Sequence, residues 1–252
     1  MWDPGLPVLD GATIALVVTV CFIAAAVSGM SGFGAGLIIT LFITPIIGPK
    51  AVIPVLSVTM LITNASRIWF FRSALAWRSI LPVVATAVPA AVAGSMVYAR
   101  LDSAEVQVLL GLVLIAAVPL RHVIHRLKIV PGRKSLLVFG GGYGFLSSVM
   151  VGAGILVIPM LLGTGLTGAA LLASDATIAV AVNATKMATF GTLEALTGPL
   201  FVIALIMGLC TIPGTWLAAR IVAMTDIRIH TALVETLIVA GGVWMVWSVL
   251  AA

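Results

Sequence analysis

The feature that most constrains this fold is a succession of ten apolar segments joined by short polar links. A transmembrane helix needs about 20 predominantly apolar residues, so membrane segments occupy most of the chain and leave no room for a second domain. Only 8% of the residues are charged, against about a quarter in an ordinary soluble domain. We therefore expect an all-α polytopic membrane protein with a single integral membrane domain over residues 1–252.

The segments fall into two groups of five on either side of a basic link at 121–134. The second segment of each group is short: residues 34–47 would reach only roughly 21 Å, against a hydrocarbon core of roughly 30 Å. Such a segment either starts or stops inside the membrane or is re-entrant, which leaves eight to ten membrane segments. The expected segments are 12–27, 34–47, 52–71, 79–98, 106–120, 135–150, 152–163, 169–190, 199–219 and 231–252.

The distribution of basic residues predicts the topology. Lys and Arg are enriched in cytoplasmic loops, which places the 121–134 link in the cytoplasm. The N-terminal residues 1–11 carry no Lys or Arg, so we expect them outside. Five crossings on each side of the link then put the C-terminus outside as well.

The two halves carry the same short motifs in the same order, 118 to 120 residues apart. We infer that they are structural repeats, over about 12–120 and 135–252. An odd number of crossings inverts the second copy, an architecture typical of secondary transporters. Gly-Phe-Gly-Ala-Gly at 32–36 corresponds to Met-Val-Gly-Ala-Gly at 150–154, Asn-Ala-Ser-Arg at 64–67 to Asn-Ala-Thr-Lys at 183–186, and Gly94 with Arg100 to Gly214 with Arg220.

The glycine-rich link before each short segment predicts an anion site. The first N–H groups of a helix have no intrahelical partner, and the dipole makes that end positive. Two such ends entering from opposite sides would meet near the midplane, where glycines permit close backbone approach and serine hydroxyls add donors. The alternative is that these small residues only let helices pack tightly. The candidates are Ser31, Gly32, Gly34, Gly36, Gly152 and Gly154, with Ser28, Ser147 and Ser148 as further donors.

Two amide and cation pairs complete the predicted site. Asn64 and Arg67 stand three residues apart, as do Asn183 and Lys186, so each pair shares one helix face. An amide beside a cation suits an oxyanion, and a charge within an apolar span is by default a functional hypothesis. Arg67, however, lies near the predicted cytoplasmic end of its segment, where its side chain would also reach the headgroups.

Asp175 is the only acid well inside an apolar segment. It could relay protons, or it could cap the start of its helix together with Ser174; we expect the cap. His122 and His125 lack a carboxylate or a third ligand nearby, so we expect no metal site. No cofactor-binding motif is present, and the clustered basic residues indicate topology and contact with anionic lipid rather than nucleic acid.

The paired glycine motifs, with Asn-Ala-Ser-Arg and Asn-Ala-Thr-Lys, resemble the TauE/SafE family, also called the 4-toluene sulfonate uptake permease family. The resemblance covers nearly the whole chain. It implies a bacterial carrier for small sulfur-containing anions such as sulfite, sulfoacetate or other organosulfonates. We expect a secondary transporter in the inner membrane, coupled to protons or to membrane potential. The chain departs from the usual pattern where many members have consecutive glycines. A passive anion channel, or an integral membrane enzyme or assembly partner, remains an alternative, and no oligomeric state is indicated.

Overall fold

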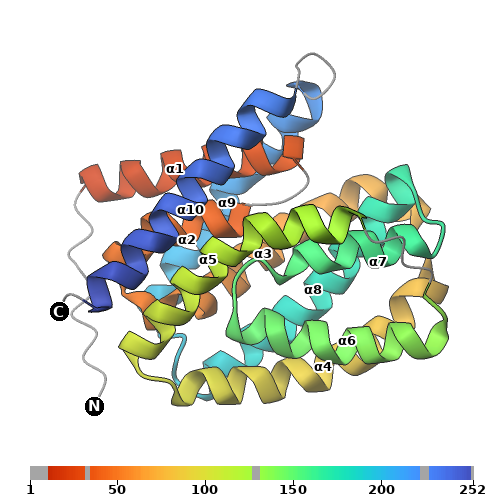
Figure 1. The fold of residues 1–252 in the computed structure, drawn as a ribbon, viewed down its shortest axis with the longest axis horizontal. Helices are drawn as coiled ribbons and strands as arrows, with labels where there is room; N and C mark the ends of the chain where they lie inside the picture. Colours follow the sequence, from red (N-terminus) through yellow and green to blue (C-terminus); the bar gives the residue numbers. More distant parts are fainter. Residues whose placement is uncertain (1–10, 32–34, 127–130, 222–226, 251–252) are drawn as a thin grey trace.

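The computed structural model of the chain describes residues 11–31, 35–126, 131–221 and 227–250, and within them it is helical, without strands (Figure 1). The helices are α1 Gly11–Ser31, α2 Ala35–Ile47, α3 Pro49–Phe71, α4 Trp77–Arg100, α5 Ser103–Arg126, α6 Arg133–Val149, α7 Val157–Gly163, α8 Gly168–Thr192, α9 Gly198–Ile221 and α10 Ile227–Leu250, with short 3₁₀ helices η1 at Arg72–Ala74 and η2 at Ala153–Leu156.

Each predicted apolar segment is a helix, and the expected all-α class is confirmed. The segment expected at 152–163 is divided into η2 and α7. The predicted link at 121–134 is shorter than expected, since α5 continues to Arg126 and α6 begins at Arg133. Arg and Leu favour helix nearly as well as Ala, so polarity alone did not end α5, whereas Pro131 and Gly132 precede α6.

Among the described residues, five helices are long and apolar enough to cross a membrane by themselves, and the protein is a multi-pass membrane protein. Within the described residues α2 and the η2–α7 segment are shorter apolar helices. The crossing helices cover Pro49–Trp69, Trp77–Arg100, Ser103–Leu120, Gly168–Thr192 and Gly198–Leu217.

Helix packing follows the order of the two repeats. The first helix of each half packs along the fourth helix of the other half: α1 along α9, and α6 along α4 (Figure 1). In the same way α3 packs against α9 and α8 against α4, while α3 contacts α8 and α5 contacts α10. These pairings are expected if two similar five-helix units pack so that equivalent helices of each unit contact the other unit. The inversion of one unit relative to the membrane stays a prediction.

The third repeated motif supplies the glycines at two of these equivalent contacts. A Cβ atom on Gly94 of α4 would lie 2.6 Å from the carbonyl oxygen of Phe145 in α6. A Cβ atom on Gly214 of α9 would collide with the carbonyl oxygen of Phe22 in α1. Both positions therefore require glycine, because the facing atom is main chain and has no rotamer to change.

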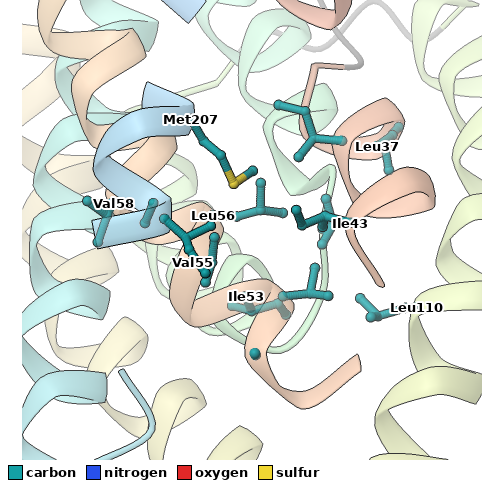
Figure 2. Close-up of a cluster of buried hydrophobic side chains, with 14 of the residues drawn as sticks. Leu37, Ile43, Ile53, Val55, Leu56, Val58, Leu110 and Met207 are labelled. Carbon is teal, nitrogen blue, oxygen red and sulfur yellow. The ribbon is translucent and has the colours of Figure 1, made fainter. Parts of the chain in front are cut away.

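The apolar interior has two parts, and α3 and α8 lie at the border between them. One cluster joins α1, α2, α3, α5, α9 and α10 with Tyr98 of α4 and Phe190 of α8, and the other joins α4, α6, α7 and α8. Figure 2 shows the first cluster, in which Leu56 of α3 lies among Ile43, Leu37 and Met207. The polar side chains described next lie on α3 and α8.

Candidate functional site: two cation stations on α3 and α8

The second glycine break is a left-handed turn that lies against the start of α2. After α6 ends at Val149, Gly152 adopts φ 84°, a conformation that favours glycine. A Cβ atom on Gly152 would also lie 2.8 Å from Leu37 Cδ2, and one on Gly36 would lie 3.3 Å from Val151 Cγ1. The break of one half and the short helix of the other are therefore neighbours.

The remaining break residues differ in what the structure describes. A Cβ atom on Gly154 would meet nothing within 4 Å, so space is open beside its backbone. Gly32 and Gly34 lie outside the described residues, and so does the side chain of Ser31. The first glycine break, at 32–36, is thus described only from Ala35, where α2 begins.

The serines before the second break serve helix packing. Ser147 Oγ donates to Gly144 O at 3.0 Å, and Ser148 Oγ lies 3.0 Å from both Ala91 O and Gly144 O. Helix carbonyls accept the protons of both hydroxyls in this arrangement, which favours packing, and their role as donors to a substrate stays a prediction. At these two positions the packing interpretation of the small residues holds.

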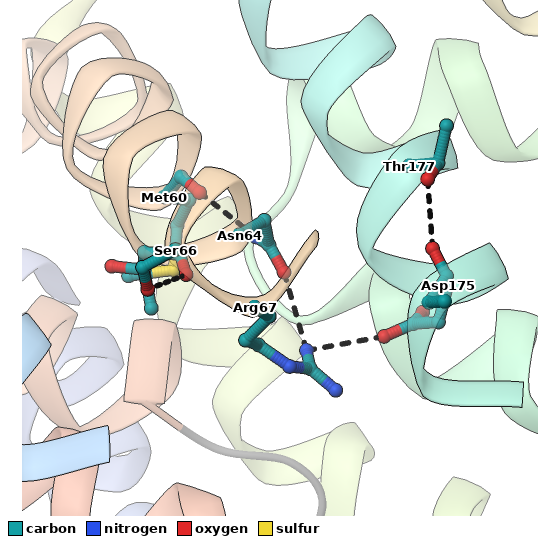
Figure 3. A network of polar contacts seen from close by, with 8 residues as sticks. Met60, Asn64, Ser66, Arg67, Asp175 and Thr177 are labelled. Carbon is teal, nitrogen blue, oxygen red and sulfur yellow. Dashed lines mark hydrogen bonds and ion pairs between the residues drawn. The ribbon is translucent and has the colours of Figure 1, made fainter. Parts of the chain in front are cut away.

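The first amide and cation pair forms a cluster with an acid from the other half (Figure 3). Arg67 Nη1 lies 3.2 Å from Asn64 Oδ1 and 3.3 Å from Asp175 Oδ2. The amide nitrogen of Asn64 donates to Met60 O at 2.8 Å. We call Asn64, Arg67 and Asp175 the Arg67 station; its cation is neutralised by the carboxylate across the α3–α8 interface.

This cluster corrects one expectation. Asp175 does not cap its helix: α8 begins at Gly168 and its N-cap residue is Thr167, because the small and apolar residues before Ser174 extend the helix by nearly two turns. Arg67 faces Asp175 across the helix interface. Its ion pair joins positions 108 residues apart, and no local pattern predicts such a contact.

The second amide and cation pair holds a buried ammonium without a carboxylate. Lys186 is only 6% exposed. Its Nζ donates to Ser147 O at 2.9 Å and to Asn183 Oδ1 at 3.1 Å, and no acidic side chain among the described residues forms a salt bridge with it. We call Ser147, Asn183 and Lys186 the Lys186 station. Its position at the last turn of α6 is favourable for a cation, since helix carbonyls make that end negative.

The structure does not bring the two stations together. Asp175 and Lys186 stand eleven residues apart on α8, which is about 16 Å along the helix axis at 1.5 Å per residue. One lies before and the other after the middle of this 25-residue helix. The positions that define the two stations are thus separated along α8, whereas the sequence suggested one shared site.

Comparison with known proteins assigns this architecture to a family. The sequence model of the family described as sulfite exporter TauE/SafE matches residues 17–245. The chain belongs to the TauE/SafE family. The match spans both stations and all ten α-helices at least in part, so this chain is a membrane protein of a transporter family. Searches of curated proteins and of solved structures gave no significant match.

Proposed function

We propose that this TauE/SafE protein is a secondary transporter of small sulfur-containing anions, such as sulfite, sulfoacetate or other organosulfonates, and that the anion binds at the Lys186 station. The observation that carries the proposal is the buried Lys186 ammonium, which has neutral oxygens and no described carboxylate around it. Burying an unpaired charge is costly. An anion that enters the station supplies the missing charge.

The donors at the Lys186 station suit an oxyanion. An ammonium group has three N–H bonds and a side-chain amide nitrogen has two. Two of the ammonium donors go to Ser147 and Asn183, while no hydrogen bond of the Asn183 amide nitrogen is found among the described residues. One ammonium proton and two amide protons are thus available to the oxygens of a sulfite or sulfonate group, a number that its three oxygens can accept.

We also propose the orientation and coupling of the transporter. The protein lies in the bacterial inner membrane with both termini outside and the link between α5 and α6 in the cytoplasm, because the basic residues gather there. The two repeats rock around the stations to give alternating access. Asp175 is the candidate for proton coupling. Its charged partner is Arg67 of α3, and Tyr143 of α6 also lies near it. The nearby cation Arg72 of η1 is exposed.

The test is transport by the purified protein in liposomes. We expect saturable sulfite uptake with counterflow, inhibited by sulfoacetate and less by taurine, whose ammonium group Lys186 repels. Lys186→Met should reduce uptake by about 10- to 100-fold, since hydrogen bonds to a charged group contribute roughly 1.5 to 3 kcal/mol. Lys134→Met, at an exposed position in the first turn of α6, is the matched control.

Two outcomes contradict the proposal. Equal flux through the Lys186→Met and Lys134→Met variants, at equal protein levels, would remove the Lys186 station from the transport path. Ohmic single-channel currents without counterflow would identify a passive anion channel instead of a carrier.

A further inference from the structure

We propose that Asp175 is a tethered anion that fills the Arg67 station in place of substrate. The protein then holds one substrate anion, at the Lys186 station, where two equivalent stations would hold two. This inference rests on the proposed anion transport, and it adds the number of anions carried and the residue that sets this number.

The two stations share their local geometry. In each, the cation donates to the amide oxygen three residues before it, at 3.2 Å for Arg67 to Asn64 and 3.1 Å for Lys186 to Asn183. They differ in the next partner of the cation. Arg67 meets the carboxylate of Asp175, whereas Lys186 meets only a main-chain carbonyl.

The difference originates at one pair of equivalent positions. Asp175 precedes Lys186 by eleven residues, and the residue that precedes Arg67 by eleven is Leu56. Leu56 is 4% exposed and its side chain packs in the apolar cluster around Met207 (Figure 2). Within the part of the chain that the structure describes, the second half therefore supplies an acid to the first, and Lys186 receives none in return.

The hydrogen-bond donors of the Arg67 station are also already used within the protein. The amide nitrogen of Asn64 donates to Met60 O, and Arg67 Nη1 is directed to Asn64 and Asp175 (Figure 3). A carboxylate about 4 Å from a bound anion weakens its binding about a thousand-fold at an effective dielectric constant of about 20. Substrate is thus excluded from the Arg67 station for as long as Asp175 remains charged and in place.

The test counts anions bound per chain, by equilibrium dialysis of the purified protein against radiolabelled sulfite. We expect one site in the wild type and two in Asp175→Asn, an almost isosteric change that removes the charge. Asp175→Ser repeats the test with a smaller side chain. Adding Arg67→Met to Asp175→Asn should return the count to one, whereas adding Lys186→Met should leave a site that depends on Arg67.

The outcomes separate this inference from the proposed function. One site in the wild type and one in both Asp175 variants would overturn the tethered anion and leave the Lys186 station intact. Two sites in the wild type would overturn it as well. A wild-type protein that binds neither sulfite nor an organosulfonate would instead contradict the proposed function on which the inference rests.

A reciprocal variant tests the asymmetry from the other half. Leu56→Asp places a carboxylate at the position equivalent to Asp175, and in the wild-type background it should abolish anion binding. Combined with Asp175→Asn it should restore one site, now lost on Arg67→Met rather than on Lys186→Met. If the restored site still depends on Lys186, the equivalence of the two stations is wrong.

Discussion

Replacing Asn183 by Asp tests whether the unpaired charge of Lys186 is what binds the anion. The substitution is nearly isosteric and puts a carboxylate oxygen where the amide oxygen now lies 3.1 Å from Lys186 Nζ. The station then becomes neutral. An anion about 4 Å from a unit charge gains about 4 kcal/mol at an effective dielectric constant of 20, so loss of the net charge should weaken binding about a thousand-fold.

The comparison variant is Asn183→Ala, which removes the amide donors without adding a charge. We expect Asn183→Ala to weaken sulfite binding by about 10- to 100-fold, and Asn183→Asp to weaken it about a thousand-fold further. Asn64→Asp adds a carboxylate at the Arg67 station, whose Asp175 stands eleven residues, or about 16 Å, before Lys186 on α8. It should change the affinity by less than tenfold.

Sulfite binding is measured by isothermal titration calorimetry of the detergent-solubilised protein at low ionic strength, with thermal unfolding to verify that each variant is folded. If Asn183→Asp and Asn183→Ala bind sulfite with equal affinity, the charge of Lys186 does not attract the anion and the reasoning fails. Equal losses in Asn183→Asp and Asn64→Asp would point to a diffuse electrostatic effect instead of a local station.

Two further predictions concern stability, measured by thermal unfolding in detergent. Gly144→Ala should be less stable than Gly142→Ala by about 1 to 3 kcal/mol. A Cβ atom on Gly144 collides with main-chain atoms of Ala87, whereas one on Gly142 meets nothing within 4 Å. Equal melting temperatures would contradict the close α4–α6 contact. Arg67→Met should lower the free energy of unfolding by roughly 1 to 3 kcal/mol, less than for a fully buried pair, since Arg67 is 24% exposed. Adding Asp175→Asn to the same chain should restore most of this loss. A double variant no more stable than Arg67→Met would show that the pair is not coupled.

The two halves share an amide and a cation at matched positions, but they differ in the acid that faces the cation. The repeated motifs place an amide and a cation at equivalent positions of α3 and α8. Asp175 and Leu56 then make these positions unequal: Arg67 has a carboxylate partner, and no described carboxylate pairs with Lys186. A strictly symmetric pair would hold either two anions or none.

Much of the fold was predictable because the membrane imposes a simple rule. Every backbone polar group in the bilayer must be satisfied within the segment, so each long apolar stretch had to be a helix. The helix ends were less predictable: α5 continues to Arg126 through polar residues, because a helix that leaves the hydrocarbon layer is free to continue in water.

The candidate site was predictable in its residue types and not in its grouping. The spacing of Asn64 and Arg67, and of Asn183 and Lys186, is local, so it determined which side chains share a helix face. The interpretation of Asp175 as a helix cap failed because α8 begins earlier, at Gly168. Its contact with Arg67 joins positions 108 residues apart, so no local spacing could predict it. Sequence spacing carries no information about which helices become neighbours.

The sequence by itself determined a helical membrane protein whose two halves carry matched motifs, with cations at matched places in apolar segments, since hydropathy and motif spacing are properties of the chain alone. Only the tertiary structure decided that the two cations occupy separate stations, and that one is neutralised by Asp175 while the other is not. The physical reason is that charge balance in a low-dielectric interior depends on which side chains face each other across the α3–α8 interface.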